Sequence, residues 1–214
     1  MVGISALSPK SRGQSVYAQI KRDLIERRIA PGTEMQEEEL AVSYGGSRTP
    51  VREALVRLTG EQLISRNGRF YVAREFRSRD IRDIYELREA LECAAARLAA
   101  ERMSDGGLAE LEQQLVKQAA AVERADWQLF DLLDVAFHRI IARECQNIVI
   151  QHQVDLILDQ VRAIRARELN LHLGPANAVD GHRRIFDALR RRNQEIAAAE
   201  MRYHIREVAK VLET

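Results

Sequence analysis

Asp134 and His138 lie four residues apart in the stretch FDLLDVAFHRII. At helical spacing their side chains share one face, and that face also carries Leu133, Phe137 and Ile141. A carboxylate on a buried face is costly unless another group pairs with it. The stretch therefore predicts a polar site inside a hydrophobic core.

Two further histidines lie on apolar faces of segments with helical periodicity nearer the C-terminus. His182 is in phase with Ile185 and Leu189, and His204 follows Met201 by one helical turn. A single histidine on an apolar face is more often a hydrogen-bonded core residue than a ligand. The carboxylate–imidazole pair upstream could likewise be a simple buried couple.

Together these side chains favour a metal site, because helical bundles build such sites from inward-facing residues on neighbouring helices. One carboxylate and three imidazoles suit Zn²⁺, Ni²⁺, Mn²⁺ or Fe²⁺ and leave coordination positions free. We therefore predict a divalent metal ion, with Zn²⁺ favoured over Ni²⁺ and Mn²⁺. The predicted ligands are Asp134, His138, His182 and His204.

The elements that must position these residues are mostly helices. The chain has 214 residues, of which 46% are hydrophobic and only 5% aromatic, and Ala, Leu, Arg and Glu are plentiful. Residues 77–214 are predicted to form an all-helical antiparallel bundle of six or seven helices. The predicted helices span 80–103, 107–124, 126–144, 147–171, 177–192 and 194–213. Asn147 is interpreted as a helix cap, and His172 is expected in a loop.

The N-terminal part has a different pattern. Residues 1–13 show no periodicity and are expected to form a flexible arm. Within 14–76, helices are predicted for 16–28, for EEELAVSY and for SRTPVREALVRLTGEQL, and two β-like runs flank the turn dipeptide Asn67-Gly68. Three helices and a hairpin describe a winged helix-turn-helix, whose third helix enters the major groove of DNA. The predicted fold class is therefore mainly α.

The third helix carries the residues that could contact DNA. Arg48 and Arg52 lie at its N-terminal end, where a planar guanidinium can pair with guanine. Thr49 and the helix N-terminus can contact a phosphate. The tip of the hairpin would add a further contact through Asn67, Gly68 and Arg69. A solvated basic helix in an unrelated scaffold is the alternative.

Charge and cysteine usage add only modest limits. Residues 1–76 carry 12 Lys/Arg and 9 Asp/Glu, and residues 77–214 carry 21 and 23, a contrast too small to indicate nucleic-acid binding alone. Cys93 and Cys145 have no spacing typical of a disulfide frame and fit a reducing compartment. No segment resembles a signal peptide or a membrane span, so we expect a cytoplasmic protein.

The stretch APGTEMQEEELAVSYGGSRTPVREALVRLTGEQLISRNGRFYVA resembles the DNA-binding domain of the GntR family of bacterial transcription regulators, and SRTPVREAL is its most specific part. The resemblance implies that Arg48, Thr49 and Arg52 contact an operator and that Gly68 lies at the wing. The chain departs from the family pattern twice. Glu38-Glu39 stands where many members carry a basic residue, and Gly45-Gly46-Ser47 stands where a valine usually anchors the turn.

Residues 80–210 are similar to the C-terminal FCD-type sensing domain of the FadR branch of that family. The resemblance implies that Asp134, His138, His182 and His204 hold a divalent metal at the floor of a cavity for small carboxylate effectors. Gly181 stands before the second histidine, where a glutamate is frequent. The Arg88 guanidinium could clamp a carboxylate, and an ion pair with Glu92 is the equally weighted alternative. Arg162 and Arg165 are weaker candidates for that clamp.

The combined hypothesis is a DNA-binding transcription regulator, expected to be a repressor, that binds a palindromic operator as a homodimer and responds to a small organic acid at a metal. Three alternatives stay open. A metal-dependent enzyme could use the Asp/His₃ site, although no buried glutamate is expected beside the ligands as a general base. The effector could instead bind the four residues without a metal, or the metal itself could be the signal.

Overall fold

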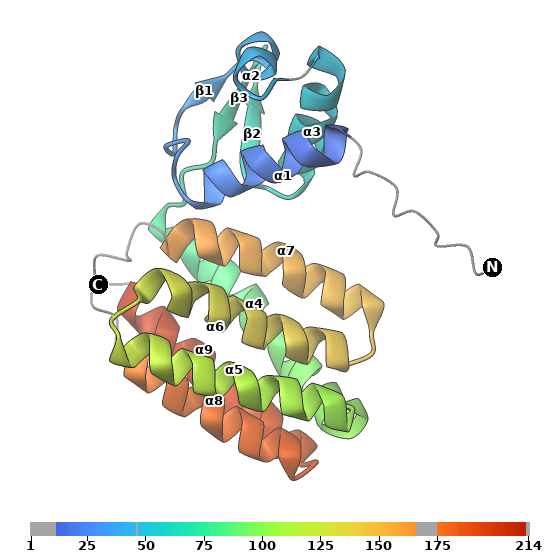
Figure 1. Ribbon diagram of the computed structural model, residues 1–214, viewed down its shortest axis with the longest axis vertical. Helices are drawn as coiled ribbons and strands as arrows, with labels where there is room; N and C mark the ends of the chain where they lie inside the picture. Colours follow the sequence, from blue (N-terminus) through green and yellow to red (C-terminus); the bar gives the residue numbers. More distant parts are fainter. Residues whose placement is uncertain (1–11, 46, 166–174, 213–214) are drawn as a thin grey trace, which may run out of the picture. The chain divides into compact units, whose positions relative to one another are not determined.

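The computed structural model of the protein describes residues 12–45, 47–165 and 175–212 (Figure 1). The chain divides into two compact units, Met1–Glu75 and Phe76–Thr214. The first is a winged helix-turn-helix and the second is all helical, so the predicted mainly α fold class is confirmed. Within the described residues, no helix is both long enough and apolar enough to cross a bilayer.

The first unit consists of three helices and three short strands within its described residues. Its elements are α1 (Arg12–Ile25), β1 (Glu34–Met35), α2 (Glu37–Ser43), α3 (Arg48–Gly60), β2 (Ile64–Asn67) and β3 (Phe70–Ala73). The predicted apolar face of α1 is buried, through Val16, Ile20, Leu24 and Ile25, and α1 packs against α3. A flexible arm over 1–13, as predicted, would place the first helical residue at 14 or later, but α1 begins at Arg12. Residues 1–11 lie outside the described residues.

The wing is a three-stranded antiparallel sheet with the order β1-β3-β2. Asn67 pairs with Phe70, so the turn residues are Gly68 and Arg69 rather than the predicted Asn67-Gly68. Gly68 has a φ of 60°, and glycine at the first central position is typical of a type II′ hairpin turn. Strand β1 was not predicted, because two residues are too few to show a period of two.

The second unit is a bundle of antiparallel helices (Figure 1). Its elements are α4 (Ser78–Arg102), α5 (Asp105–Glu123), α6 (Trp127–Glu144), α7 (Ile148–Arg165), α8 (Pro175–Arg190) and α9 (Gln194–Leu212). The predicted boundaries agree within a few residues, except that the predicted end of the helix over 147–171, like His172, lies outside the described residues. Helix α4 contacts α6, α7, α8 and α9, and its buried alanines Ala95, Ala96, Ala99 and Ala100 allow close approach.

Side-chain caps fix where several of these helices begin. Ser104 accepts a hydrogen bond from the Gly107 amide, and Asp126 accepts one from the Leu129 amide, both at 3.0 Å. Asn147 Oδ1 accepts from the amides of Val149 and Ile150 at 3.1 and 3.2 Å. Such caps satisfy amides that a helix leaves unpaired in its first turn. The predicted cap role of Asn147 is therefore confirmed.

Candidate metal centre and nucleic-acid interface

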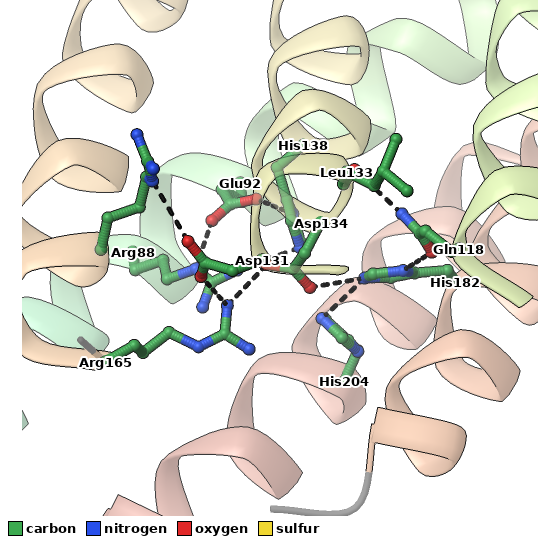
Figure 2. Close-up of polar contacts among 11 residues, drawn as sticks. Arg88, Glu92, Gln118, Asp131, Leu133, Asp134, His138, Arg165, His182 and His204 are labelled. Carbon is green, nitrogen blue, oxygen red and sulfur yellow. Dashed lines mark hydrogen bonds and ion pairs between the residues drawn. The ribbon is translucent and has the colours of Figure 1, made fainter. Parts of the chain in front are cut away.

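Three helices bring the four predicted metal ligands together. Helix α6 carries Asp134 and His138, α8 carries His182, and α9 carries His204. All four side chains are buried, and each offers one ligand atom within 4.8 Å of the others. Figure 2 shows them converging between the helices: His182 Nε2 lies 3.2 Å from His204 Nε2 and 3.5 Å from Asp134 Oδ1.

A glutamine fixes the orientation of the His182 ring. The Gln118 amide nitrogen donates to the Leu133 carbonyl at 3.0 Å, so its oxygen must face the imidazole. That oxygen lies 2.7 Å from His182 Nδ1, which places the ring proton on Nδ1 and leaves a lone pair on Nε2. Gln118 is fully buried. This is the support that a metal-ligating histidine needs from its surroundings.

His138 is fixed by a glutamate that the sequence interpretation did not anticipate. Glu92 is buried on α4 and its Oε2 contacts His138 Nδ1. Its other oxygen accepts from Arg88 Nε at 2.6 Å, and Arg88 Nη2 lies 3.0 Å from His138 Nε2. A buried glutamate thus does lie beside the predicted ligands, contrary to expectation, but its ion pair with Arg88 does not make it the general base that an enzyme would need. The spacing of Glu92, four residues after Arg88, was the available signal. It predicts an ion pair with Arg88 but not a contact with His138.

Arginine compensates the buried Asp134 carboxylate on one side. Arg165 Nη1 donates to Asp134 Oδ2 at 2.6 Å, whereas Oδ1 is buried and makes no hydrogen bond to any other described residue. Asp131, one turn earlier on α6, accepts from Arg162 Nε at 3.2 Å and lies 3.9 Å from Arg165. The buried Asp134 carboxylate is thus tolerated through ion pairing, and one of its oxygens is left to bind a cation.

Burial and neighbouring charges shift the pKa values of the cluster in opposite directions. Desolvation lowers the pKa of His182 to about 3 and that of His204 well below its ordinary value. Burial opposes ionisation of Asp134 and Glu92, yet Arg165 lowers the pKa of the first, and His138 with Arg88 lowers that of the second to about 2. The cluster therefore holds ionised carboxylates, together with His182 and His204 as neutral imidazoles with available lone pairs.

These donors fit a divalent transition metal. Neutral imidazole nitrogens and a carboxylate oxygen are ordinary ligands of Zn²⁺, Ni²⁺ and Mn²⁺. The unpartnered Asp134 oxygen and the facing Nε2 atoms of His182 and His204 would each gain a partner from a shared cation. Calcium is a poor fit, because it prefers a shell of oxygen atoms.

A pocket of about 750 Å³ opens beside the cluster, between α8 and α9. His204, Arg165, Tyr203 and Arg184 line it, but Arg88 does not. Gly181 lines it too, and a Cβ atom at that position would lie only 2.8 Å from His204 Nδ1. The glycine thus makes room for the imidazole. The Arg88–Glu92 ion pair weighed as an alternative is present. Of the three arginines that the sequence suggested for the clamp, Arg165, a weaker candidate, is the one that lines the pocket.

In the first unit, the exposed face of α3 presents the predicted DNA-contacting residues. Arg48, Thr49 and Arg52 are exposed and line a shallow hollow at α2 and α3. Arg48 Nη2 lies 2.7 Å from Glu38 Oε1, whereas Arg52 makes no ion pair or hydrogen bond with another described residue. A contact of Arg48 with DNA would therefore have to break its ion pair with Glu38, whereas a contact of Arg52 would break no such pair.

The hairpin tip presents the other predicted contacts. Asn67, Gly68 and Arg69 are all exposed, and the Arg69 guanidinium lies 4.8 Å from the ring centroid of Phe70. Arg66, which sequence reasoning did not select, is also exposed and its Nε donates to the Gly68 carbonyl at 3.2 Å. The wing is thus more basic than predicted.

A winged helix with exposed arginines, joined to a helical domain with a pocket, is the architecture of a DNA-binding regulator. Residues 12–70 match the bacterial regulatory proteins of the gntR family, and residues 83–207 match the FCD domain. The chain therefore belongs to the GntR family, and its FCD domain fits the FadR branch.

Individual relatives agree with that assignment. The chain is 30% identical over 197 residues to the HTH-type transcriptional repressor RspR of Escherichia coli K12, covering 92% of this chain and 86% of that protein. It is 33% identical over 204 residues, 93% of this chain and 84% of that protein, to an HTH-type transcriptional regulator of Streptomyces ambofaciens. These relatives are transcription regulators, so the chain is a DNA-binding transcription regulator and not an enzyme.

A solved structure supports the fold alone. The Escherichia coli protein McbR/YncC superposes with a TM-score of 0.83 at 22% sequence identity, covering 95% of this chain and 98% of that one.

Proposed function

We propose that this regulator is a repressor whose affinity for its operator is set by a small carboxylate effector bound at a divalent metal. Asp134, His138, His182 and His204 would hold the metal. The observation that carries the proposal is their convergence within 4.8 Å beside a pocket of about 750 Å³. When bound, the metal would supply a positive charge and open coordination positions to a carboxylate.

Arginines would complete the effector site. Arg165 lines the pocket and already holds Asp134, and a guanidinium can bind a carboxylate through two parallel hydrogen bonds. Arg88 was the first candidate for this role, and it would need to leave Glu92 or His138 to fill it. We therefore assign the effector clamp to Arg165 as well as to Arg88.

The DNA-binding half of the proposal gives each residue a role. Arg48 and Arg52 would contact base edges, Thr49 a phosphate, and the wing residues Asn67, Gly68 and Arg69 the flanking backbone or minor groove. We assign DNA binding to residues 14–76 and effector binding with dimerisation to residues 77–214. A twofold homodimer would match a palindromic operator, and the protein would act in the cytoplasm. RspR, the relative named above, is called a repressor, which supports that direction of control.

The first test is elemental analysis of tag-free protein purified without chelators, alongside His204→Ala. We expect close to one divalent ion per chain and its loss in the variant. Absence of metal from the native protein, with no uptake of added Zn²⁺, Ni²⁺ or Mn²⁺, would contradict the metal site while leaving the DNA-binding assignment intact.

The second test measures DNA affinity with an operator selected from random duplexes. Affinity should change when a panel of small organic acids is added to the metal-loaded protein and stay unchanged when they are added to His204→Ala. A change caused by metal alone, with no effect of any acid, would favour the metal itself as the signal. An acid response that survives in His204→Ala would favour direct binding without metal.

A further inference from the structure

We propose that the Arg88 guanidinium occupies Nε2 of His138 in the metal-free protein and that a divalent metal must displace it from this nitrogen. Metal binding would then move a side chain of α4. This inference rests on the metal site of the proposed function and adds the residue that controls how that site fills. It comes from a closed ring of contacts among Arg88, Glu92 and His138.

Each member of the ring contacts the other two. Arg88 Nε donates to Glu92 Oε1 at 2.6 Å, and Arg88 Nη2 lies 3.0 Å from His138 Nε2. Glu92 Oε2 contacts His138 Nδ1 and closes the ring, as Figure 2 shows. All three residues are only 1% exposed. Solvent therefore cannot replace any of these contacts cheaply.

The ring leaves His138 a single way to bind Arg88. A carboxylate beside Nδ1 requires a proton on that nitrogen, so the lone pair of a neutral ring lies on Nε2. A guanidinium has only donors, so Arg88 Nη2 must donate to that lone pair. An imidazole nitrogen has one lone pair. The hydrogen bond from Arg88 and coordination by Nε2 therefore exclude each other.

Asp134 and Arg165 present the opposite case in the same cluster. Arg165 donates to Asp134 Oδ2 at 2.6 Å, while Oδ1 makes no hydrogen bond to any residue in the described part of the chain. The aspartate can thus offer an oxygen to a cation with Arg165 still in place. Of these two arginines, only Arg88 competes for a ligand atom.

Displacement need not free Arg88 completely. The guanidinium is planar and moves as one unit, and its Nη1 is buried with no hydrogen bond to another described residue, so a shift away from His138 breaks no hydrogen bond of Nη1 and can leave the group beside Glu92. Helix α4, which carries it, begins at Ser78, directly after the segment where the first unit ends at Glu75. The exchange at His138 therefore acts on the helix nearest in sequence to the DNA-binding unit.

The test compares two variants that each remove one positive charge beside the cluster, Arg88→Met and Arg165→Met. Chelator-treated full-length proteins are titrated with Zn²⁺ or Ni²⁺ alone by calorimetry. Loss of a nearby cation strengthens metal binding in both, but only Arg88→Met also frees a ligand lone pair. We expect Arg88→Met to bind metal about fivefold or more tightly than wild type and to gain more than Arg165→Met.

A second measurement does not depend on metal affinity. In ¹⁵N NMR spectra of metal-free protein, the His138 Nε2 signal should move in Arg88→Met, because its hydrogen-bond donor is gone, and stay in place in Arg165→Met. Should Arg88→Met fail to fold because Glu92 loses a partner, Arg88→Met combined with Glu92→Gln, with Arg165→Met combined with Glu92→Gln as its control, replaces the pair, with the same expected order.

The outcomes separate the two proposals. Wild-type protein that takes up no metal contradicts the proposed function itself. Wild-type protein that binds metal, with Arg88→Met gaining no more than Arg165→Met, leaves the proposed function standing and overturns the displacement.

Discussion

At the scale of single residues, the two arginines at the N-terminal end of α3 are not equivalent. Arg48 is paired with Glu38 at 2.7 Å, although both side chains are more than half exposed, so that pair contributes little to stability. Arg52 has no such partner in the described residues and can turn toward DNA without breaking a contact. Arg52 is therefore the better candidate for reading a base.

Replacing Arg52 with alanine should weaken specific DNA binding by about 1–3 kcal/mol, because a bidentate contact with a base edge is lost. The measurement is fluorescence anisotropy with the selected operator and with a random duplex of equal length. Equal losses on both duplexes, with a shallower dependence on salt concentration, would instead assign Arg52 to a phosphate.

The sequence could predict the four metal-ligand candidates because each lies at helical spacing within an apolar face, and Asp134, His138, His182 and His204 do converge. It could not predict which groups surround them. Glu92 and Gln118 are polar residues on amphipathic helices, and only the packing of α4 and α5 against α6 and α8 turns them inward. Contacts between helices distant in sequence leave no local periodic signal, and the two-residue strand β1 is too short to leave one.

At the scale of elements, the approach of α8 to α9 depends on a missing side chain. A Cβ atom on Gly181 of α8 would lie 2.8 Å from His204 Nδ1 of α9, closer than real Cβ contacts occur. Because both neighbouring helices are packed, the imidazole would have to move. The position of His204 thus depends on the residue before His182.

Gly181→Ala should therefore reduce metal affinity by about 10- to 100-fold, as loss of ligand support does at other metal sites. The matched control is Gly106→Ala on α5, where the nearest atom to the added Cβ is Ser104 Oγ at 3.8 Å. Calorimetric titration with Zn²⁺ compares the two. Wild-type affinity in Gly181→Ala would mean that His204 is not a ligand or that α9 yields easily.

At the scale of the whole molecule, the buried histidines link folding to pH. The pKa of His182 is lowered to about 3 and that of His204 well below its ordinary value. An unfolded chain binds protons at these residues below about pH 6.5, whereas the folded chain does not. The contribution of neutral His182 and His204 to the free energy of unfolding is therefore fully present above pH 6.5 and is lost as the pH falls.

For metal-free protein, the free energy of unfolding should fall between pH 7 and pH 5 by up to about 1.4 kcal/mol per pH unit for each of these histidines. The single tryptophan, Trp127 on α6, reports unfolding of the helical unit by fluorescence in urea. His182→Gln should flatten the pH dependence, and His152→Gln, at an exposed position on α7, should not. A flat profile in the wild type would show that these imidazoles are not held neutral.

The ring of Arg88, Glu92 and His138 also bears on the lifetime of the polypeptide. Many small metal-binding domains fold only with the metal bound, because the site does not exist in the unfolded chain and metal binding supplies the free energy of folding. Here the arginines already balance the carboxylates, and His138 already has a donor. Under the proposed function, the chain can therefore complete its synthesis and folding before its metal ion arrives. One molecule could be loaded and emptied many times without passing through a state that proteases recognise.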